Sequence, residues 1–248
     1  MKINICFSTD NNYIKPLYSS ITSILKNADI DTDLNIFILE NDLSDKNKNI
    51  LLNLKTIKEC EIKFIKIETT LISDLPDFKE NLNYISKTSF FRFFVADLLK
   101  DIDKIIYLDC DIIVLSDLKS LFIQDIQNNY IAAVEDIGYY CNLSKHKYLK
   151  NFDFYINAGV LLINLQIWRQ KKLSLTLSNI GKQKIKDFIF LDQDILNVVC
   201  KNKIKLLDFS YNVQTDCLKK GILSKHPKKK RIKEDIKKTK IIHYTSSK

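Results

Sequence analysis

Two aspartates, Asp109 and Asp111, interrupt the apolar stretch IIYLDCDIIVLSDL, which begins at Ile105. Residues i and i+2 of an extended chain face the same side, so the two carboxylates converge while Cys110 points the opposite way, into the core. Like charges in an apolar stretch are costly to bury unless a cation offsets them. Mg²⁺ and Mn²⁺ prefer oxygen ligands and commonly join carboxylates to phosphates. The pair therefore predicts a divalent-metal site, and two solvated acids at the end of a strand are the structural alternative.

Three other stretches carry polar side chains at the border of apolar runs. His243 follows the apolar residues 241–242, and a neutral imidazole can complete a carboxylate metal site, although a lone histidine is more often structural. Asn157 precedes the run AGVLLIN, where its amide suits sugar hydroxyls or a simple turn. Asp192 and Gln193 open the segment DQDILNVV, where Asp192 also fits a helix N-cap. Each of these residues is a candidate for a polar site.

A strand that ends in Asp-x-Asp also occurs in phosphatases of the haloacid dehalogenase type, in which the first aspartate is the nucleophile. Those enzymes usually carry Thr or Val four residues after that aspartate, where this chain has Ile113, and their strand lies near the N-terminus. The chain has only four glycines and no glycine-rich phosphate loop. The phosphates of a bound nucleotide therefore need another positive partner.

The elements that position these side chains alternate between strand and helix. Apolar runs predict strands at 3–7, 34–39, 62–67, 104–108, 130–134, 160–164 and 240–242. Helical spacing predicts helices at 13–27 and 192–200, and a helix that runs through Trp168. It also predicts a helix that starts after the N-cap Ser44 and an amphipathic helix that starts at Thr88. The alternation predicts an α/β fold with an open, doubly wound, mostly parallel sheet. Ligands bind beyond the carboxyl ends of such strands, where STDNN follows the first strand and DCD follows the fourth.

Charge is unevenly distributed along the 248 residues. The formal charge is +9, but residues 218–248 hold twelve Lys or Arg against Glu234 and Asp235, so this segment nets +10 and residues 1–217 net 9 − 10 = −1. We therefore expect a core domain over 1–217 and a basic C-terminal segment over 218–248. Such a segment suits phosphate, nucleic acid or an anionic membrane surface, and a solvated basic face is the alternative.

Composition narrows the expected compartment. The chain has no apolar run of about 18 residues that could span a membrane, and its N-terminus lacks the apolar region of a signal peptide. The six cysteines show neither a CxxC pair nor zinc spacing. This pattern is typical of a reduced, cytoplasmic protein.

Six segments, taken in order, resemble glycosyltransferase family 8, the retaining enzymes that include bacterial lipopolysaccharide galactosyl- and glucosyltransferases and glycogenin. They are CFSTDNNY, FFRFFVADLL, YLDCDIIVLSDL, FYINAGVLLINLQIWR, FLDQDILN and IIHYTSSK. The resemblance implies a GT-A fold with a Rossmann-like nucleotide-binding half. It also implies that galactose or glucose moves from UDP-galactose or UDP-glucose to a saccharide, glycolipid or glycoprotein acceptor, as in bacterial lipooligosaccharide synthesis. The implied cofactor is Mn²⁺, with Mg²⁺ as the alternative.

The resemblance also implies roles for individual residues. The matching metal ligands are Asp109, Asp111 and His243, and Asp109 also matches a ribose contact. Positions around the uracil and ribose match Thr9, Asp10, Asn12 and, near the base, Tyr13. Positions at the donor sugar match Arg92, Asn157, Asp192 and Gln193, with Gln193 nearest the anomeric carbon. The implied mechanism is same-face attack through an oxocarbenium-like ion pair, in which the diphosphate helps to take the proton of the acceptor.

The C-terminus departs from the family pattern His-x-x-Gly-x-x-Lys-Pro-Trp. Either Ser246 replaces the glycine, or the glycine is deleted and Lys248 is the motif lysine that reaches the diphosphate. We therefore expect a truncated chain that lacks part of the diphosphate site and an acceptor or membrane segment. Residues 218–240 of the basic segment are then expected to face an anionic acceptor or the inner membrane leaflet rather than nucleic acid. The non-enzymatic alternative is an impaired GT-A domain that acts as a basic surface-binding module.

Overall fold

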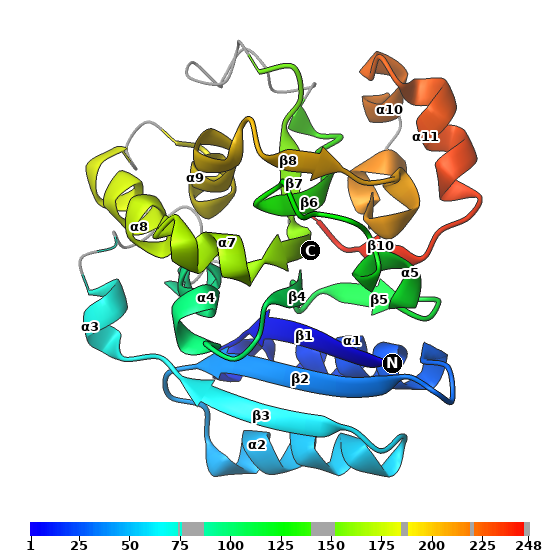
Figure 1. Ribbon diagram of the computed structural model, residues 1–248. Helices are drawn as coiled ribbons and strands as arrows, with labels where there is room; N and C mark the ends of the chain where they lie inside the picture. Colours follow the sequence, from blue (N-terminus) through cyan, green and yellow to red (C-terminus); the bar gives the residue numbers. More distant parts are fainter. Residues whose placement is uncertain (74, 76–86, 140–151, 185–187, 219–220, 246–248) are drawn as a thin grey trace.

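The computed structural model describes residues 1–73, 75, 87–139, 152–184, 188–218 and 221–245 (Figure 1). Within them, a seven-stranded sheet has the order β3-β2-β1-β4-β7-β6-β8. Its strands in chain order are β1 (Lys2–Ser8), β2 (Asp33–Glu40), β3 (Glu61–Lys66), β4 (Lys104–Leu108), β6 (Ile131–Glu135), β7 (Ile156–Asn164) and β8 (Ile204–Leu206). β7 is antiparallel to β4 and β6, and the other neighbouring pairs are parallel. The predicted α/β fold with a mostly parallel sheet is confirmed, and β3-β2-β1-β4 form its Rossmann-like half.

Helices cover both faces of this sheet, as a doubly wound fold requires (Figure 1). The α-helices of the described residues are α1 (Ile14–Asn27), α2 (Asp45–Leu52), α3 (Thr69–Ile72), α4 (Val95–Leu98), α5 (Lys119–Phe122), α7 (Leu165–Gln170), α8 (Leu173–Lys184), α9 (Leu191–Cys200), α10 (Ile222–Lys225) and α11 (Lys229–Ile236). Short 3₁₀ helices are η1 (Asn11–Tyr13), η2 (Asn53–Thr56), η3 (Lys87–Phe94), η6 (Phe209–Tyr211) and η7 (Thr215–Leu218). None of the helices among the described residues is long and apolar enough to cross a lipid bilayer.

The strands are apolar on both faces because each face packs against helices. On β1, Ile5 and Phe7 belong to the hydrophobic cluster that includes the apolar side of α1, whereas Cys6 belongs to the cluster that includes η3 and α9. Successive side chains of a strand point to opposite faces, so this alternation is expected. The two clusters fix the sheet, and the carboxyl ends of β1 and β4 therefore form a rigid edge.

A second, three-stranded sheet joins distant parts of the chain. β10 (Ile241–His243) lies between β5 (Ile112–Val114) and β9 (Val213–Gln214), antiparallel to β5 and parallel to β9. Beyond the strand ends, Tyr244 N donates to Asp111 O at 2.9 Å, and Leu115 N donates to Lys240 O at 2.7 Å. This pairing places the C-terminal strand beside the two aspartates that follow β4.

Side chains of α1, instead of another strand, bond the opposite edge of β5. Ser20 Oγ accepts from Ile112 N at 3.3 Å and lies 2.7 Å from Ile112 O and 2.5 Å from Cys110 O, to which it donates. One turn later, Ser23 Oγ accepts from Val114 N at 2.9 Å. Residues i and i+3 of a helix lie on one face, so both hydroxyls reach the same edge. Helix α1 thus holds the backbone between Asp109 and β5.

Two local predictions are wrong. The segment after Thr88 is the 3₁₀ helix η3 followed by α4, and its residues 90–94 are all buried, so it is not the predicted amphipathic helix. Residues 90–96 pack inside the helical layer, and Asp97 is the first exposed residue after them. Asn157 does not form the turn considered for it but lies within β7. The other predicted strands, and the helix capped by Ser44, are confirmed within a few residues.

Candidate active site at the carboxyl ends of β1 and β4

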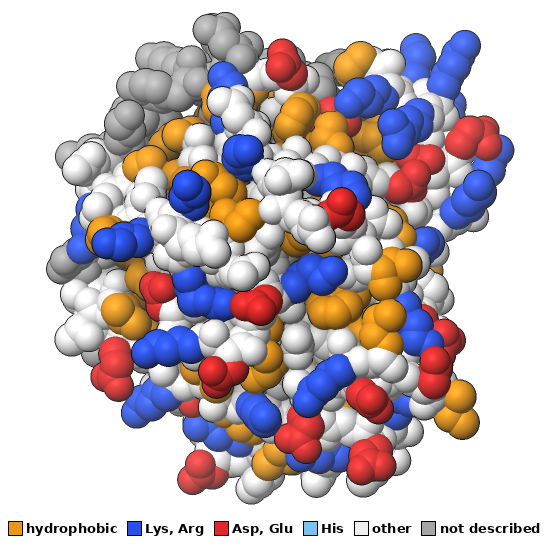
Figure 2. Space-filling model, in the orientation of Figure 1, with side chains coloured by type: hydrophobic (Ala, Val, Ile, Leu, Met, Phe, Trp, Pro, Cys, Tyr) orange, Lys and Arg blue, Asp and Glu red, His pale blue; other side chains and the backbone are white. Residues whose placement is uncertain are grey.

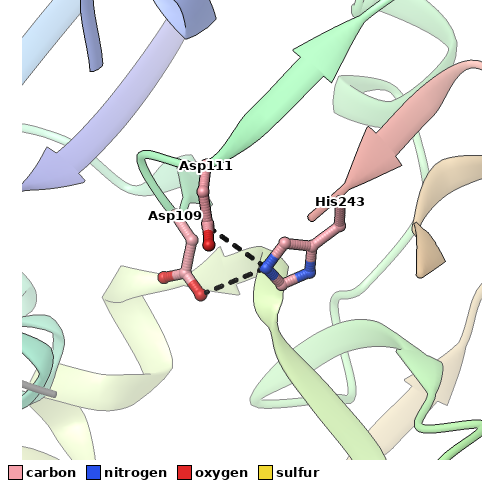
Figure 3. Close-up of side chains that lie close together, drawn as sticks. All are labelled: Asp109, Asp111 and His243. Atoms are coloured by element: carbon pink, nitrogen blue, oxygen red, sulfur yellow. Dashed lines mark ion pairs between the residues drawn. The ribbon is translucent and has the colours of Figure 1, made fainter. Parts of the chain in front are cut away.

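Asp109, Asp111 and His243 converge just beyond the end of β4 (Figure 3). His243 Nε2 lies 3.3 Å from Asp111 Oδ1 and 3.7 Å from Asp109 Oδ2. One ligand atom from each residue lies within 4.8 Å of the other two. The backbone fixes this arrangement, because Asp109 N donates to Gly159 O at 2.8 Å and Tyr244 N donates to Asp111 O at 2.9 Å. Two separate segments of the chain therefore meet at one cluster of ligands.

The electrostatics of this cluster favour a positive charge between the side chains. His243 is only 4% exposed, and burial, the largest influence, lowers its pKa. The hydrogen bond to Asp111 and the charges of Asp111 and Asp109 outweigh burial and hold the pKa of His243 above its ordinary value. A divalent cation would satisfy the same oxygens and the imidazole nitrogen. Two carboxylates and one imidazole are a donor set that suits Mn²⁺, and Mg²⁺ less closely.

Arg92 is buried and bonds two carboxylates of the site. Its Nη2 lies 2.8 Å from Asp109 Oδ1, and its Nε lies 3.1 Å from Asp192 Oδ2. Nη1 donates to Ala158 O at 2.6 Å, and the guanidinium lies 4.6 Å from the centroid of the Tyr107 ring. A guanidinium is always charged, and these partners hold it in one place. Arg92 therefore links the cluster of Asp109, Asp111 and His243 to the first turn of α9.

Helix α9 begins with an uncommon backbone conformation. Leu191 has a φ of 44°, in the left-handed region that non-glycine residues rarely adopt. The predicted N-cap, Asp192, is wrong, because the N-cap residue is Phe190 and no described side chain caps the helix. The backbone N–H groups of residues 189–190, which lead into α9, each donate to Asp194 Oδ2 at 2.7 Å. Asp192 turns to Arg92 instead. Burial, only partly offset by Arg92, raises the pKa of Asp192 to about 6.

Asp136, directly after β6, joins the two candidate carboxamides. Its Oδ2 accepts from Asn157 Nδ2 at 3.1 Å and from Gln193 Nε2 at 3.1 Å. Gln193 Oε1 accepts from Ala158 N at 2.9 Å, and Gln193 Nε2 also donates to the Tyr155 hydroxyl at 3.2 Å. Both carboxamides are thus held in defined orientations between β7 and α9.

The candidate nucleotide contacts follow β1. Asp10 Oδ1 accepts from Asn12 N at 2.9 Å and Tyr13 N at 3.2 Å, which starts η1. Thr9 is buried, and its N–H donates to the carbonyl of residue 39 in β2. Burial first, and then the charge of Asp111, raises the pKa of Tyr13. A hollow of about 280 Å³, lined by Asp10, Asn12 and side chains of η3, lies beside this turn.

The structure brings most of the predicted site residues into contact. Direct hydrogen bonds or ion pairs join Asp109 with Arg92 and His243, Asp111 with His243, and Arg92 with Asp192, while Asn157 and Gln193 meet at Asp136. Thr9, Asp10, Asn12 and Tyr13 form the separate turn after β1. Lys248 lies outside the described residues.

Sequence analysis missed Asp136, Gly159 and Asn212. Asp136 follows an apolar strand as Asp109 does, and that position was a usable signal. A Cβ added at Gly159 would lie 2.1 Å from His243 Cε1, so only glycine leaves room for this ring. Asn212 Oδ1 lies 3.1 Å from His243 Nδ1, a contact between distant segments that nothing local signals.

Comparison with known proteins gives one consistent result. The family described as Glycosyl transferase family 8 matches residues 4–248. A Haemophilus influenzae protein, whose name assigns it provisionally to the glycosyltransferases, is 33% identical over 85% of this chain, and the chain spans 63% of that protein's length.

Solved structures agree with the match in sequence. The galactosyltransferase LgtC, solved with donor and acceptor sugar analogues, has a TM-score of 0.82 and 27% identity, covering 99% of this chain and 87% of LgtC. The bifunctional glycosyltransferase WbbM has a TM-score of 0.86 and 25% identity, covering 99% of this chain and 46% of WbbM. The predicted GT-A fold is confirmed by these likenesses.

Proposed function

The chain belongs to glycosyl transferase family 8, and on that premise we propose that it moves a hexose, galactose or glucose, from a UDP-sugar to a saccharide acceptor with retention of the anomeric configuration. The acceptor would be a glycolipid or glycoprotein glycan, as in the synthesis of bacterial surface lipooligosaccharide. The single observation that carries this proposal is the convergence of Asp109, Asp111 and His243 beside Arg92.

These three side chains would hold Mn²⁺, or Mg²⁺ in its place. When bound, the ion would bridge to the diphosphate and stabilise the charge that develops on the leaving UDP. Arg92 supports this reading because it fixes Asp109 from the opposite side at 2.8 Å, so the carboxylate is oriented before any ligand arrives. A ligand held in place in advance binds a metal without further ordering.

At the donor sugar, we propose that Asp192, Asn157 and Gln193 contact the hydroxyls. The Asp192 carboxylate is already paired with Arg92 at 3.1 Å, which suits hydrogen bonding to a sugar better than covalent attack. Gln193 is held at both ends of its amide and would pack beside the anomeric carbon without reacting. This arrangement supports same-face transfer, in which the departing diphosphate helps to take the proton of the acceptor.

The turn after β1 would bind the nucleoside. Thr9, Asp10 and Asn12 would lie around the uracil and ribose, and Tyr13 would stack near the base. The hollow of about 280 Å³ beside Asp10 and Asn12 supports this placement. Lys248 would add a positive charge at the diphosphate.

The basic segment would contact an anionic surface, for which we propose the cytoplasmic face of a membrane that carries a glycolipid acceptor. Figure 2 shows Lys and Arg side chains gathered, with a few acids, over the region where Figure 1 draws α10 and α11. Among the residues whose exposure the structure describes, its exposed cations are Lys229, Lys230, Arg231, Lys233, Lys237 and Lys238. Ile232 on the same helix is buried, so α11 turns its basic side outward. Sedimentation with anionic vesicles tests this contact, and binding that does not weaken as salt rises would contradict it.

Calorimetric titration of UDP, with Mn²⁺ and then with EDTA, tests the catalytic proposal. We expect binding only with Mn²⁺, and loss of that binding in Asp111→Ala, which removes a metal ligand. Asp97→Ala, an exposed acid of α4, is the matched control and should bind like the wild type. UDP binding by Asp111→Ala with wild-type affinity would show that the metal assignment is wrong.

Turnover separates the rival functions. A glycosyltransferase should release UDP from UDP-galactose or UDP-glucose, faster with acceptor. An impaired surface-binding domain would bind UDP without releasing it from either sugar. A phosphatase would release phosphate from simple phosphomonoesters whether or not UDP is present.

A further inference from the structure

A chain of hydrogen bonds runs from Asp136 to the imidazole of His243. Asp136 Oδ2 accepts from Asn157 Nδ2 at 3.1 Å, and Asn157 Oδ1 accepts from Asn212 Nδ2 at 2.9 Å. Asn212 Oδ1 then faces His243 Nδ1 at 3.1 Å. Asn212 is completely buried, so each of its polar atoms must find a partner inside the protein.

The direction of this chain follows from its fixed members. The Asp136 carboxylate can only accept, so Asn157 must turn its Nδ2 toward it. Independently, the Gly159 N–H can only donate, and it lies 3.0 Å from Asn157 Oδ1. Asn212 must therefore offer its Nδ2 to that oxygen and its Oδ1 to His243. An amide oxygen cannot donate, so the hydrogen between Asn212 and His243 belongs to Nδ1 of the ring.

We propose that Asn212 is a positioning residue: it accepts the Nδ1–H of His243 and so aims Nε2, which faces Asp111 Oδ1 at 3.3 Å, at the metal ion, which would replace the hydrogen that Nε2 directs to Asp111. The inference rests on the metal-dependent function proposed above. A histidine ligand depends on a partner at its other nitrogen to fix its tautomer and orientation. Here that partner is a neutral amide, which adds no charge to a cluster that already holds two carboxylates.

The same chain connects the metal cluster to the donor sugar. Asn157 and Gln193 both bond Asp136 Oδ2, so the side chains proposed to contact the sugar and the imidazole proposed to bind the metal belong to one network. Asn212 is the member that joins its two halves. A change at Asn212 should therefore affect the metal ion more directly than the sugar.

Nuclear magnetic resonance of the free protein tests the position of the proton without any metal. The chain has three histidines, and His146→Gln and His226→Gln assign the signals of the third. In wild-type protein labelled with ¹⁵N-histidine, we expect a slowly exchanging Nδ1–H for His243 at neutral pH. In Asn212→Leu this signal should be lost to exchange with water, and in Asn212→Asp, which keeps an acceptor, it should remain. An unprotonated Nδ1 in the wild type, or an unchanged signal in Asn212→Leu, would overturn the proposal.

Binding of Mn²⁺ in the presence of UDP, followed by electron paramagnetic resonance, tests the consequence. We expect Asn212→Leu to weaken Mn²⁺ binding about 10-fold or more. Asn212→Asp keeps the acceptor for Nδ1–H but loses the donor to Asn157, so it should weaken Mn²⁺ binding less than Asn212→Leu does. Asn35→Leu is the matched control, because Asn35 is a buried asparagine of β2 that bonds Asn4, near the opposite ends of the strands. Its Mn²⁺ affinity should equal that of the wild type.

The two measurements separate failure of the inference from failure of the proposed function. Equal Mn²⁺ affinity in the wild type and Asn212→Leu would overturn the inference and leave the metal-dependent function standing. A wild type that shows the protected Nδ1–H but binds no Mn²⁺ would overturn the proposed function, while the position of the proton would stand.

Discussion

Gly159 is the residue at which an added methyl group would disturb the site most. A Cβ there would lie 2.1 Å from His243 Cε1, 2.6 Å from His243 Nδ1 and 2.9 Å from Asp109 Oδ2. Ordinary van der Waals contact begins at 3.4 Å, so the ring would have to move by 3.4 − 2.1 = 1.3 Å, or β7 would have to move away from it. Neither motion is small compared with the tolerance of metal–ligand distances, about 0.2 Å.

Gly159→Ala should therefore act on the metal cluster more than on the fold. We expect a cost of about 1–3 kcal/mol in the free energy of unfolding, typical of overpacking. Mn²⁺ affinity should fall about 10-fold or more, as when a ligand loses its orientation, and turnover should fall about 100-fold. Urea denaturation and calorimetric titration of UDP with Mn²⁺ measure the first two effects.

Gly181→Ala is the matched control. Its Cβ would lie 3.1 Å from Leu75 Cδ2 and 3.4 Å from Ile195 Cδ1, which are the movable ends of flexible side chains. Gly181 lies within α8, where alanine is favoured over glycine by up to about 1 kcal/mol. We expect normal Mn²⁺ and UDP binding. If Gly159→Ala also bound Mn²⁺ and UDP like the wild type, the packing of His243 against β7 would be wrong.

Two further perturbations test the site. Asp192 has a pKa of about 6 in the folded protein, against an ordinary value of 3.8. Between these two pH values the folded state holds a proton that the unfolded state has released. The free energy of unfolding therefore falls as pH rises through this window. Asp192→Asn should remove this loss. The free energy of unfolding of the variant, measured relative to the wild type by urea denaturation, should therefore rise by about 3 kcal/mol between pH 4 and 7. A difference between the two proteins that does not change with pH would contradict the pKa. Ser20→Ala should leave the buried Ile112 N–H without its partner and cost about 1–3 kcal/mol. Ser20→Ala should also weaken Mn²⁺ binding, because Ser20 bonds the backbone beside Asp111. The control Ser23→Ala should lower stability without affecting Mn²⁺ binding. Equal Mn²⁺ affinity in the two variants would show that α1 does not position the aspartates.

The convergence of Asp109 and Asp111 could be predicted from the sequence because it depends only on local geometry. A strand that is apolar to its end, followed by two acids two residues apart, favours both acids on one side, and hydrogen bonds from Asp109 N to Gly159 O and from Tyr244 N to Asp111 O then fix them there. The position of Asp136 after β6 could have been predicted for the same reason. These residues need only the direction in which their own strand runs.

Contacts between distant segments could not be predicted in this way. His243 reaches the aspartates because β10 pairs with β5 and β9. Its place after an apolar run made it a candidate ligand, but only the family resemblance joined it to Asp109 and Asp111 before the structure did. The ion pairs of Arg92 with Asp109 and Asp192 join η3, the end of β4 and α9, and no pattern within η3 indicates either partner.

The wrong N-cap has a physical cause at a single residue. Asp192 and Asp194 both stand in the first turn of α9, and both are suitable capping side chains. The left-handed φ of Leu191 redirects the backbone just before them, so Asp194 accepts from the N–H groups of residues 189–190 and Asp192 turns to Arg92. A left-handed leucine is unfavourable by about 1–2 kcal/mol and is not predictable from sequence. Such strain is often retained where it places a functional side chain.

The balance of charge at the site explains why a cation would be required for the donor to bind. Apart from Asp10 in the turn after β1, the described part of the site holds five carboxylates: Asp109, Asp111, Asp136, Asp192 and Asp194. Arg92 bonds two of them, Asp109 and Asp192. A sugar diphosphate is itself an anion, so a site with this excess of negative charge would repel it. Arg92 cannot reverse the sign, because its charge is already shared between Asp109 and Asp192. A divalent ion held by Asp109, Asp111 and His243 would supply the missing positive charge next to the diphosphate, which is why we expect EDTA to abolish UDP binding rather than only to slow turnover.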